Sequence, residues 1–165
     1  MNADELRAKQ APIKRRYKDT PEAAKVTSRA EAVLSDDDIS CRIKTWAGET
    51  VAGLHAATGG DGSQACSADM LLEALVACAG TTLKAVATAS GIALRHARVS
   101  AQGVWDARGT LGVDRSAPVG LTDIRLHFDI DTDAAPEKVK RLIETTERYC
   151  VILQTLRTPP AITTA

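Results

Sequence analysis

Residues 67–91 read SADMLLEALVACAGTTLKAVATASG. Leu, Ala and Met dominate this stretch, which opens on a residue favoured as a helix N-cap, Ser67, and closes on Gly91, where a C-terminal glycine is common. Its apolar residues cover most of the helical wheel, whereas a surface helix confines them to one stripe. The stretch predicts one long helix, buried on several sides as a central core or dimer element.

Short strand patterns flank this helix on both sides. Apolar and polar residues alternate over Val26–Leu34 and again over Ile39–Ile43, with Ser and Asp turn residues between them, which predicts a hairpin with Cys41 on its apolar face. A third strand is expected over Thr50–His55, followed by a glycine-rich loop that lacks the ending of a phosphate-binding loop. Two further strands are expected after the helix, at the ranges 95–105 and 121–131.

The last element has helical periodicity from Ala134 to Leu156, with Pro136 in its first turn. The β-branched pair at 151–152, directly after Cys150, allows a break at that point. The order of elements therefore predicts an α+β fold with an antiparallel sheet, a long buried central helix and a second cysteine-bearing helix. We expect residues 1–25 to form a charged helical arm, in which Pro12 begins a second short helix, and residues 26–165 to form one domain.

Composition narrows the classes of function. Lys plus Arg and Asp plus Glu balance at 21 each, so the charge footprint of a nucleic-acid-binding protein is missing. The N-terminus lacks the pattern of a secretion signal, and no run of about 18 uninterrupted apolar residues occurs. We expect a soluble, cytoplasmic protein without nucleic-acid or membrane partners.

The chain has four cysteines, at 41, 66, 78 and 150, and three histidines. They show none of the spacings of a metal site, so no metal is expected, and a cytoplasmic setting favours free or redox-active thiols over structural disulfides. Cys78 and Cys150 lie in different predicted helices. If these helices bring their Cα atoms within about 4.4–6.8 Å, the pair can close a disulfide and act as a redox site.

The helix segment Leu71–Cys78, followed by Thr-Thr-Leu, resembles the first cysteine helix of the OsmC and Ohr family, the osmotically inducible and organic hydroperoxide resistance proteins. The segment Glu147–Cys150 resembles the family's second cysteine helix, and Gly59-Gly60 also fits. The resemblance implies an intertwined homodimer with active sites at the subunit interface. It also implies a thiol peroxidase without a bound cofactor: Cys78 attacks an organic hydroperoxide, Cys150 resolves the sulfenic acid as a disulfide, and an external dithiol of the lipoyl type restores both thiols.

The family pattern is changed at several positions, among them Val151, which stands where a proline often follows the second cysteine. Where well-characterised members carry a Glu that orients an activating Arg, ten residues before the first cysteine, this chain has Ala68. Residues that stand near the changed positions are candidates for supporting roles: Asp69, Arg29, His55 and Arg108. The loop from Arg108 to Arg115 is similar to that of an OsmC-like branch outside the best-studied hydroperoxidases.

Three functions remain open on the sequence. The first is reduction of organic hydroperoxides in oxidative stress defence by Cys78 and Cys150. The second is a non-catalytic OsmC-like dimer that binds a small apolar or electrophilic ligand, and the third is a structural dimer with inert cysteines. Cys66 is an alternative resolving thiol under the first of these.

Overall fold

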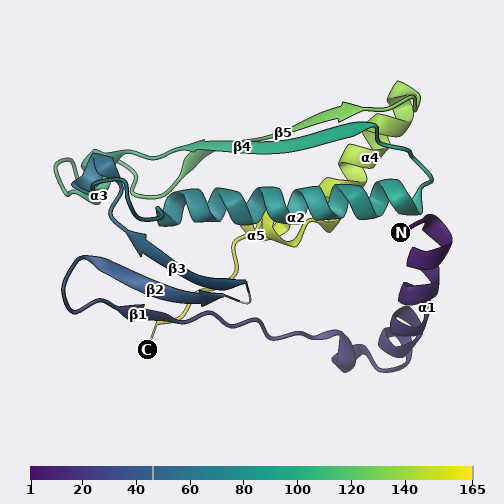
Figure 1. Ribbon diagram of the computed structural model, residues 1–165, viewed down its shortest axis with the longest axis horizontal. Helices are drawn as coiled ribbons and strands as arrows, with labels where there is room; N and C mark the ends of the chain where they lie inside the picture. The colour runs from purple at the N-terminus through teal and green to yellow at the C-terminus, as the bar shows by residue number, and fades with distance from the viewer. Residues whose placement is uncertain (46, 165) are drawn as a thin grey trace. The chain divides into compact units, whose positions relative to one another are not determined.

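The computed structural model describes residues 1–45 and 47–164 (Figure 1), and its longest helix is α2, Ser67–Ala89. The Met70 N–H donates to the Cys66 carbonyl at 3.0 Å, so Cys66 and not Ser67 is the residue that precedes the first helical turn. The helix ends as expected. Gly91 adopts φ +66°, and the N–H of Ile92 reaches back to the Ala87 carbonyl at 2.9 Å, which closes a Schellman motif.

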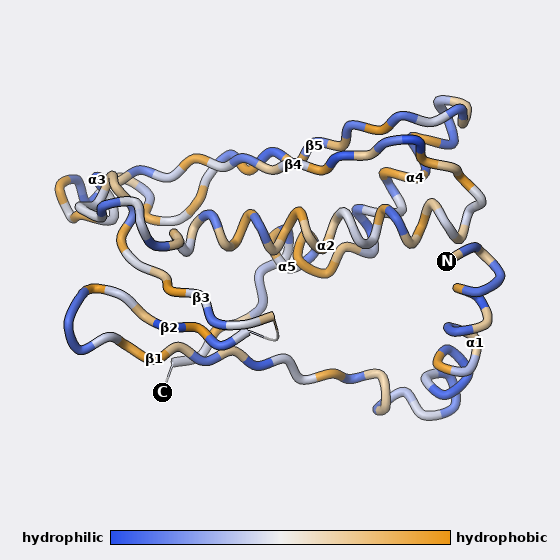
Figure 2. Tube along the Cα trace, in the orientation of Figure 1, coloured by the Kyte–Doolittle hydropathy of each residue, from blue (hydrophilic) through white to orange (hydrophobic). Residues whose placement is uncertain are grey.

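The buried residues of α2 recur once per turn at Leu75, Ala79, Leu83 and Ala87. Partly buried residues flank this fully buried stripe, Cys78 and Ala85 on one side and Gly80 on the other, so α2 is the buried central helix that the sequence predicts, with one face exposed in the single chain. Hydrophobic positions nevertheless extend along the whole helix (Figure 2), and α2 is long and apolar enough to cross a membrane by length and composition alone, as core helices of soluble proteins also are. A helix this apolar needs further cover on its remaining sides.

Three antiparallel strands form the first sheet: β1 at Ala32–Leu34, β2 at Ser40–Thr45 and β3 at Gly48–Gly53. Cys41 lies opposite Leu34 on one side and Ala52 on the other. The expected hairpin is present, but its first strand is shorter than the alternation suggested. Because Ala32 pairs with Ile43 and β2 ends at Thr45, residues 26–29 lie beyond the end of β2 and have no strand to pair with.

The second sheet contains β4, His96–Val104, and β5, Thr122–Asp131, close to the predicted ranges. The Arg95 N–H bonds the Asp131 carbonyl, so the start of one strand meets the end of the other and the pair is antiparallel. Exposed and partly buried residues alternate along β5, with His127 on the exposed face. The short helix α3, Ala107–Thr110, lies in the connection between the strands.

The C-terminal helical segment is divided at Cys150. Helix α4 covers Pro136–Tyr149 and α5 covers Val151–Arg157, while Cys150 has an extended backbone with ψ 105°. The Cys150 N–H still bonds the Thr146 carbonyl, and its own carbonyl accepts from the Gln154 N–H, both at 2.9 Å. The break allowed by the β-branched pair is therefore present, and Cys150 ends one helix and begins the next.

The N-terminal arm is helix α1, Ala3–Asp19, followed by a 3₁₀ turn, η1, at Pro21–Ala24. Pro12 lies inside α1, so the expected second helix does not begin there. The arm has no buried residue, and water can bond the carbonyl that a proline leaves without a partner. The boundary at residue 25 between arm and domain stays a prediction.

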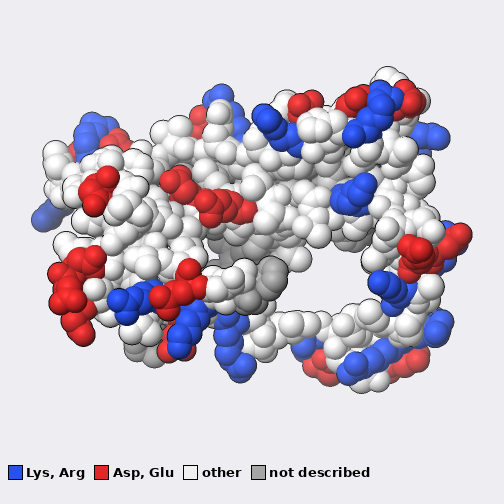
Figure 3. Space-filling view, in the orientation of Figure 1, with Lys and Arg blue, Asp and Glu red and all other residues white. Residues whose placement is uncertain are grey.

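Figure 3 shows one face of the molecule, on which acidic and basic side chains are intermingled.

By their contacts, the residues form two compact units. The first contains residues 1–26, 74–100 and 126–165, and its core is a cluster of Leu83, Ala87 and Leu142 from α2 and α4. Partly buried side chains of β4, β5 and the turn after α2 pack against this cluster; they include Val99, Phe128 and Ile130. The second unit contains residues 27–73 and 101–125, with the three-stranded sheet and the first turns of α2.

Candidate functional site

Cys78 and Cys150 lie together in the first unit, although 72 positions separate them along the chain. Cys78 is partly exposed on α2, next to the buried stripe, and Cys150 is completely buried at the α4–α5 break. A hydrogen bond joins the two thiols, and α5 lies beside the middle of α2 (Figure 1). Two helices far apart in sequence thus bring one cysteine each to a common position.

The surroundings of Cys78 favour its thiolate. Burial alone would raise the pKa of this thiol, but hydrogen bonds from the Ile152 N–H, the Cys150 thiol, the Val151 N–H and the Thr82 hydroxyl hold the pKa below its ordinary value of 9.0. The two N–H groups belong to the first turn of α5, where backbone donors have no partner within the helix. The break at Cys150 therefore aims unpaired donors at the Cys78 sulfur, and these take the place of a cationic side chain.

The surroundings of Cys150 have the opposite effect. Burial raises the pKa of the Cys150 thiol above its ordinary value of 9.0. The Leu153 N–H opposes this effect, while the hydrogen bond to Cys78 and the negative charge there add to it. Cys78 therefore loses its proton at a lower pH than Cys150 does. Since the thiolate is the nucleophilic form of cysteine, this asymmetry distinguishes an attacking thiol from a second thiol that waits for the first to react.

The four residues expected to support the site, Arg29, His55, Asp69 and Arg108, all belong to the second unit. Arg29 is exposed before β1, and Asp69 is exposed in the first turn of α2. Arg108 is engaged locally, because its Nε donates to both carboxylate oxygens of Asp106 at 3.1 Å. Their supporting roles stay predictions.

His55 makes contacts within the second unit that the other three residues do not make. It caps the 3₁₀ turn η2, Ala56–Thr58, where its Nδ1 accepts a hydrogen bond from the Ala57 N–H at 2.9 Å. Its ring meets the Trp105 ring edge to face, with centroids 5.3 Å apart. Both residues line a cavity within the second unit, and Cys66 lines the same cavity.

Within the described residues, all four cysteines are free thiols and no group of three His, Cys, Asp or Glu side chains has the geometry of a metal site. Sequence reasoning looked for an activating cation and missed the backbone donors of α5. The signal for them was the β-branched pair after Cys150, which marked the helix break but not the direction of the freed N–H groups.

Several solved structures have the same architecture as this chain. An OsmC-like protein from Mycoplasma pneumoniae is 21% identical, with a TM-score of 0.67 over 81% of this chain and 89% of that one. An organic hydroperoxide resistance protein from Legionella pneumophila is 17% identical, with a TM-score of 0.63 over 82% and 92%. The organic hydroperoxide resistance protein OhrB of Bacillus subtilis is 17% identical, with a TM-score of 0.55 over 81% and 93%.

These likenesses define a mixed helix and antiparallel-sheet protein of the OsmC/Ohr fold. The family model for OsmC-like proteins matches residues 60–165, and this chain belongs to that family. Among curated proteins, none matches the sequence significantly. The match begins just before α2, so it includes both cysteine helices.

Proposed function

We propose that this protein reduces organic hydroperoxides at the Cys78–Cys150 pair. The observation that carries the proposal is the hydrogen bond from the Cys150 thiol to Cys78, with the two pKa values moved in opposite directions. A two-cysteine peroxidase needs one ionised and one protonated thiol within reach of each other. The family membership and the hydroperoxide resistance proteins among the structural neighbours agree with this chemistry.

In the first step, the Cys78 thiolate attacks the terminal oxygen of the hydroperoxide. An S–O bond forms, the O–O bond breaks, and the alkoxide takes a proton to leave as an alcohol. Cys78 is oxidised to a sulfenic acid. The N–H groups of Val151 and Ile152, which stabilise the thiolate, also face the oxygen-bearing sulfur.

Loss of the negative charge on Cys78 prepares the second step. The charge that raises the pKa of Cys150 disappears when the sulfenic acid forms, while the opposing donors from Leu153 and Ile152 remain. Cys150 can then lose its proton and attack the Cys78 sulfur, which forms the disulfide and releases water. Cys78 therefore ionises first, and Cys150 ionises more readily once Cys78 has been oxidised.

An external dithiol closes the cycle. It attacks the disulfide, passes two electrons to the cysteines and leaves as its own disulfide, so that one hydroperoxide and one dithiol become alcohol, water and oxidised dithiol. A lipoyl-type dithiol fits this step, because its second thiol completes the exchange intramolecularly. Because the cycle consumes reducing equivalents, a reducing compartment such as the cytoplasm is the location that we propose for the protein.

An apolar substrate fits the site better than hydrogen peroxide does. The side chains that flank Cys150, Tyr149 and Val151, are 60% and 67% exposed. A hydroperoxide with an alkyl or aryl group can bury part of this apolar surface on binding.

We also propose that the working form is a homodimer. Only one stripe of α2 is buried in the single chain, while apolar and small residues on its other faces, such as Ala77, are exposed. A second copy of α2 is the occupant whose apolar surface matches these faces. An Ala77→Asp variant should shift the protein toward monomer in sedimentation velocity, whereas Ala24→Asp on the exposed turn η1 should not. A monomeric wild-type protein would contradict this part of the proposal.

The proposed function is tested by measuring catalytic turnover of hydroperoxides. Reduced protein with excess dihydrolipoamide should consume cumene hydroperoxide faster than hydrogen peroxide, and should lose this activity in Cys78→Ser. The alternative, a non-catalytic dimer that binds an apolar or electrophilic ligand, predicts no consumption beyond the rate of the dithiol alone. Activity that survives in Cys78→Ser would remove the proposed nucleophile.

A further inference from the structure

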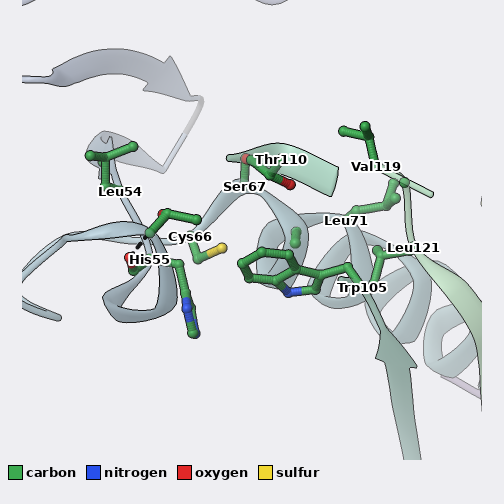
Figure 4. A pocket seen from close by; sticks show the side chains of 13 residues that line it. Leu54, His55, Cys66, Ser67, Leu71, Trp105, Thr110, Val119 and Leu121 are labelled. Atoms are coloured by element: carbon green, nitrogen blue, oxygen red, sulfur yellow. Dashed lines mark hydrogen bonds between the residues drawn. The ribbon is translucent and has the colours of Figure 1, made fainter. Parts of the chain in front are cut away.

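A cavity of about 360 Å³ opens in the second unit, and it belongs to none of the steps above. This volume lies within the usual range of small-molecule sites. The cavity is mainly apolar, with a thiol, an imidazole and an indole among its lining groups (Figure 4). The side chains that form its walls are Leu54, Leu71, Trp105, Val119 and Leu121, with Cys66, His55 and Thr110 as polar members.

The backbone fixes Cys66 at the cavity. The preceding residue, Ala65, bridges to β3 through two hydrogen bonds, from the Gly53 N–H at 3.0 Å and to the Val51 carbonyl at 3.1 Å. The Cys66 carbonyl then begins α2 by accepting from Met70. The thiol is partly exposed, and Figure 4 shows its sulfur pointing toward the Trp105 indole.

His55 is held as a hydrogen-bond donor. Because its Nδ1 accepts from the Ala57 N–H, the neutral ring carries its proton on Nε2. The edge-to-face contact with Trp105 limits the rotation of the ring. The cavity therefore combines a nucleophile, an N–H donor and a flat aromatic wall.

We propose that this cavity is a second ligand site, at which Cys66 adds to an apolar α,β-unsaturated carbonyl compound. Cys66 is the one cysteine among the described residues that line the cavity. A peroxide would leave a sulfenic acid here without a second thiol in the cavity, whereas conjugate addition to carbon needs a single thiol. The site does not depend on the Cys78–Cys150 chemistry.

The addition balances without an oxidant or a cofactor. The Cys66 sulfur gives up its proton to water and forms an S–C bond to the β-carbon, and the electron pair of the double bond moves toward the carbonyl oxygen. The Nε2–H of His55 donates a hydrogen bond to this oxygen as negative charge develops. The α-carbon then takes a proton from water, and the product is a saturated thioether. Trp105 packs against the conjugated system of the ligand.

The test compares two reagents at two matched thiols in the fully reduced wild-type protein. Cinnamaldehyde requires the cavity, while iodoacetamide reports only thiol accessibility, and both Cys66 and Cys41 are partly exposed. Peptide mass spectrometry after borohydride reduction reads each cysteine separately. The ratio of Cys66 to Cys41 labelling should be roughly tenfold higher with cinnamaldehyde than with iodoacetamide. Equal ratios for the two reagents would overturn the proposal.

Two further experiments distinguish binding in the cavity from the simple reactivity of the Cys66 thiol. Hydrocinnamaldehyde, which lacks the double bond, should protect Cys66 but not Cys41 from iodoacetamide; absence of protection at saturating concentration would contradict a ligand site. His55→Asn keeps an acceptor for the Ala57 N–H but removes the imidazole. It should slow cinnamaldehyde addition at Cys66 by roughly fivefold and leave the iodoacetamide rate unchanged. An equal loss with both reagents would reduce His55 to a structural role.

Discussion

The Cys150 thiol donates a hydrogen bond to the sulfur of Cys78, and the two groups differ in the direction of their pKa shifts. The partly exposed cysteine is the one that ionises first, and the buried cysteine keeps its proton. The proposed roles of nucleophile for Cys78 and resolving thiol for Cys150 rest on this relationship. In the proposed mechanism, substrate reaches the partly exposed thiol while the buried thiol stays protected until the first step is complete.

Removal of each thiol should have a different effect. Cys78→Ser should abolish hydroperoxide consumption, because hydroxyl oxygen is not ionised at neutral pH. Cys150→Ser should react once and stop at the sulfenic acid, which dimedone traps for mass spectrometry. Cys41→Ser, in β2, is the control and should keep full activity. Normal multiple turnover in Cys150→Ser would reassign the resolving role, with Cys66 as the next candidate.

The reaction rate should depend on pH in the direction set by the Cys78 donors. Because the folded protein holds the pKa of Cys78 below 9.0, its thiolate persists as pH falls below the ordinary range and is lost only as pH passes through the lowered value. Cys150 should ionise above 9.0. Alkylation of Cys78 by iodoacetamide should thus have a lower midpoint in the folded protein than in urea. Coincident midpoints would contradict the stabilisation by α5.

The Thr82 hydroxyl is one hydrogen-bond donor to Cys78 that can be removed without changing the others. Thr82→Val keeps the volume but removes the hydrogen bond to the Cys78 sulfur. Loss of about 1 kcal/mol should slow oxidation of Cys78 roughly fivefold at neutral pH in stopped-flow measurements. The neighbouring Thr81→Val is matched, since the Thr81 hydroxyl bonds the Ala77 carbonyl on the exposed side. Equal effects of the two variants would indicate a change in the helix and not in the site.

The core cluster predicts a large cost for Leu83→Ala. Leu83 is 2% exposed and packs with Ala87 and Leu142. Truncation should lower the free energy of unfolding by about 2–5 kcal/mol, as measured by urea denaturation. Val113→Ala in the connection between β4 and β5, at 73% exposure, should change it by less than about 0.5 kcal/mol. A small effect at Leu83 would show that the cluster is not the core of its unit.

Local patterns predicted much of this fold. The Gly91 signal located the end of α2, and alternation located β4 and β5 to within a residue or two. Pro12 was misleading, because an exposed helix can continue past a proline when water replaces the lost partner. The Val26–Leu34 alternation overestimated β1, because β2 ends at Thr45 and leaves the first residues of that stretch without a partner strand.

The site was predicted less completely. The motif around Cys78 and the second cysteine at 150 identified the pair, and the β-branched residues that follow identified the helix break. The donors could not be predicted, because the direction of the Ile152 N–H depends on the extended backbone at Cys150, a tertiary property. The cavity at Cys66 likewise depends on the approach of Trp105 to His55, which lie 50 positions apart.

The most direct measurement of the central claim is oxidation of the reduced protein by one equivalent of cumene hydroperoxide, followed by mapping of its cysteines. Hydrogen peroxide in parallel tests the preference for an organic substrate. The proposed mechanism predicts a rapid disulfide between Cys78 and Cys150, formed faster with cumene hydroperoxide, with Cys41 and Cys66 left as thiols. Four untouched thiols after several minutes, or a disulfide that excludes Cys78, would contradict it.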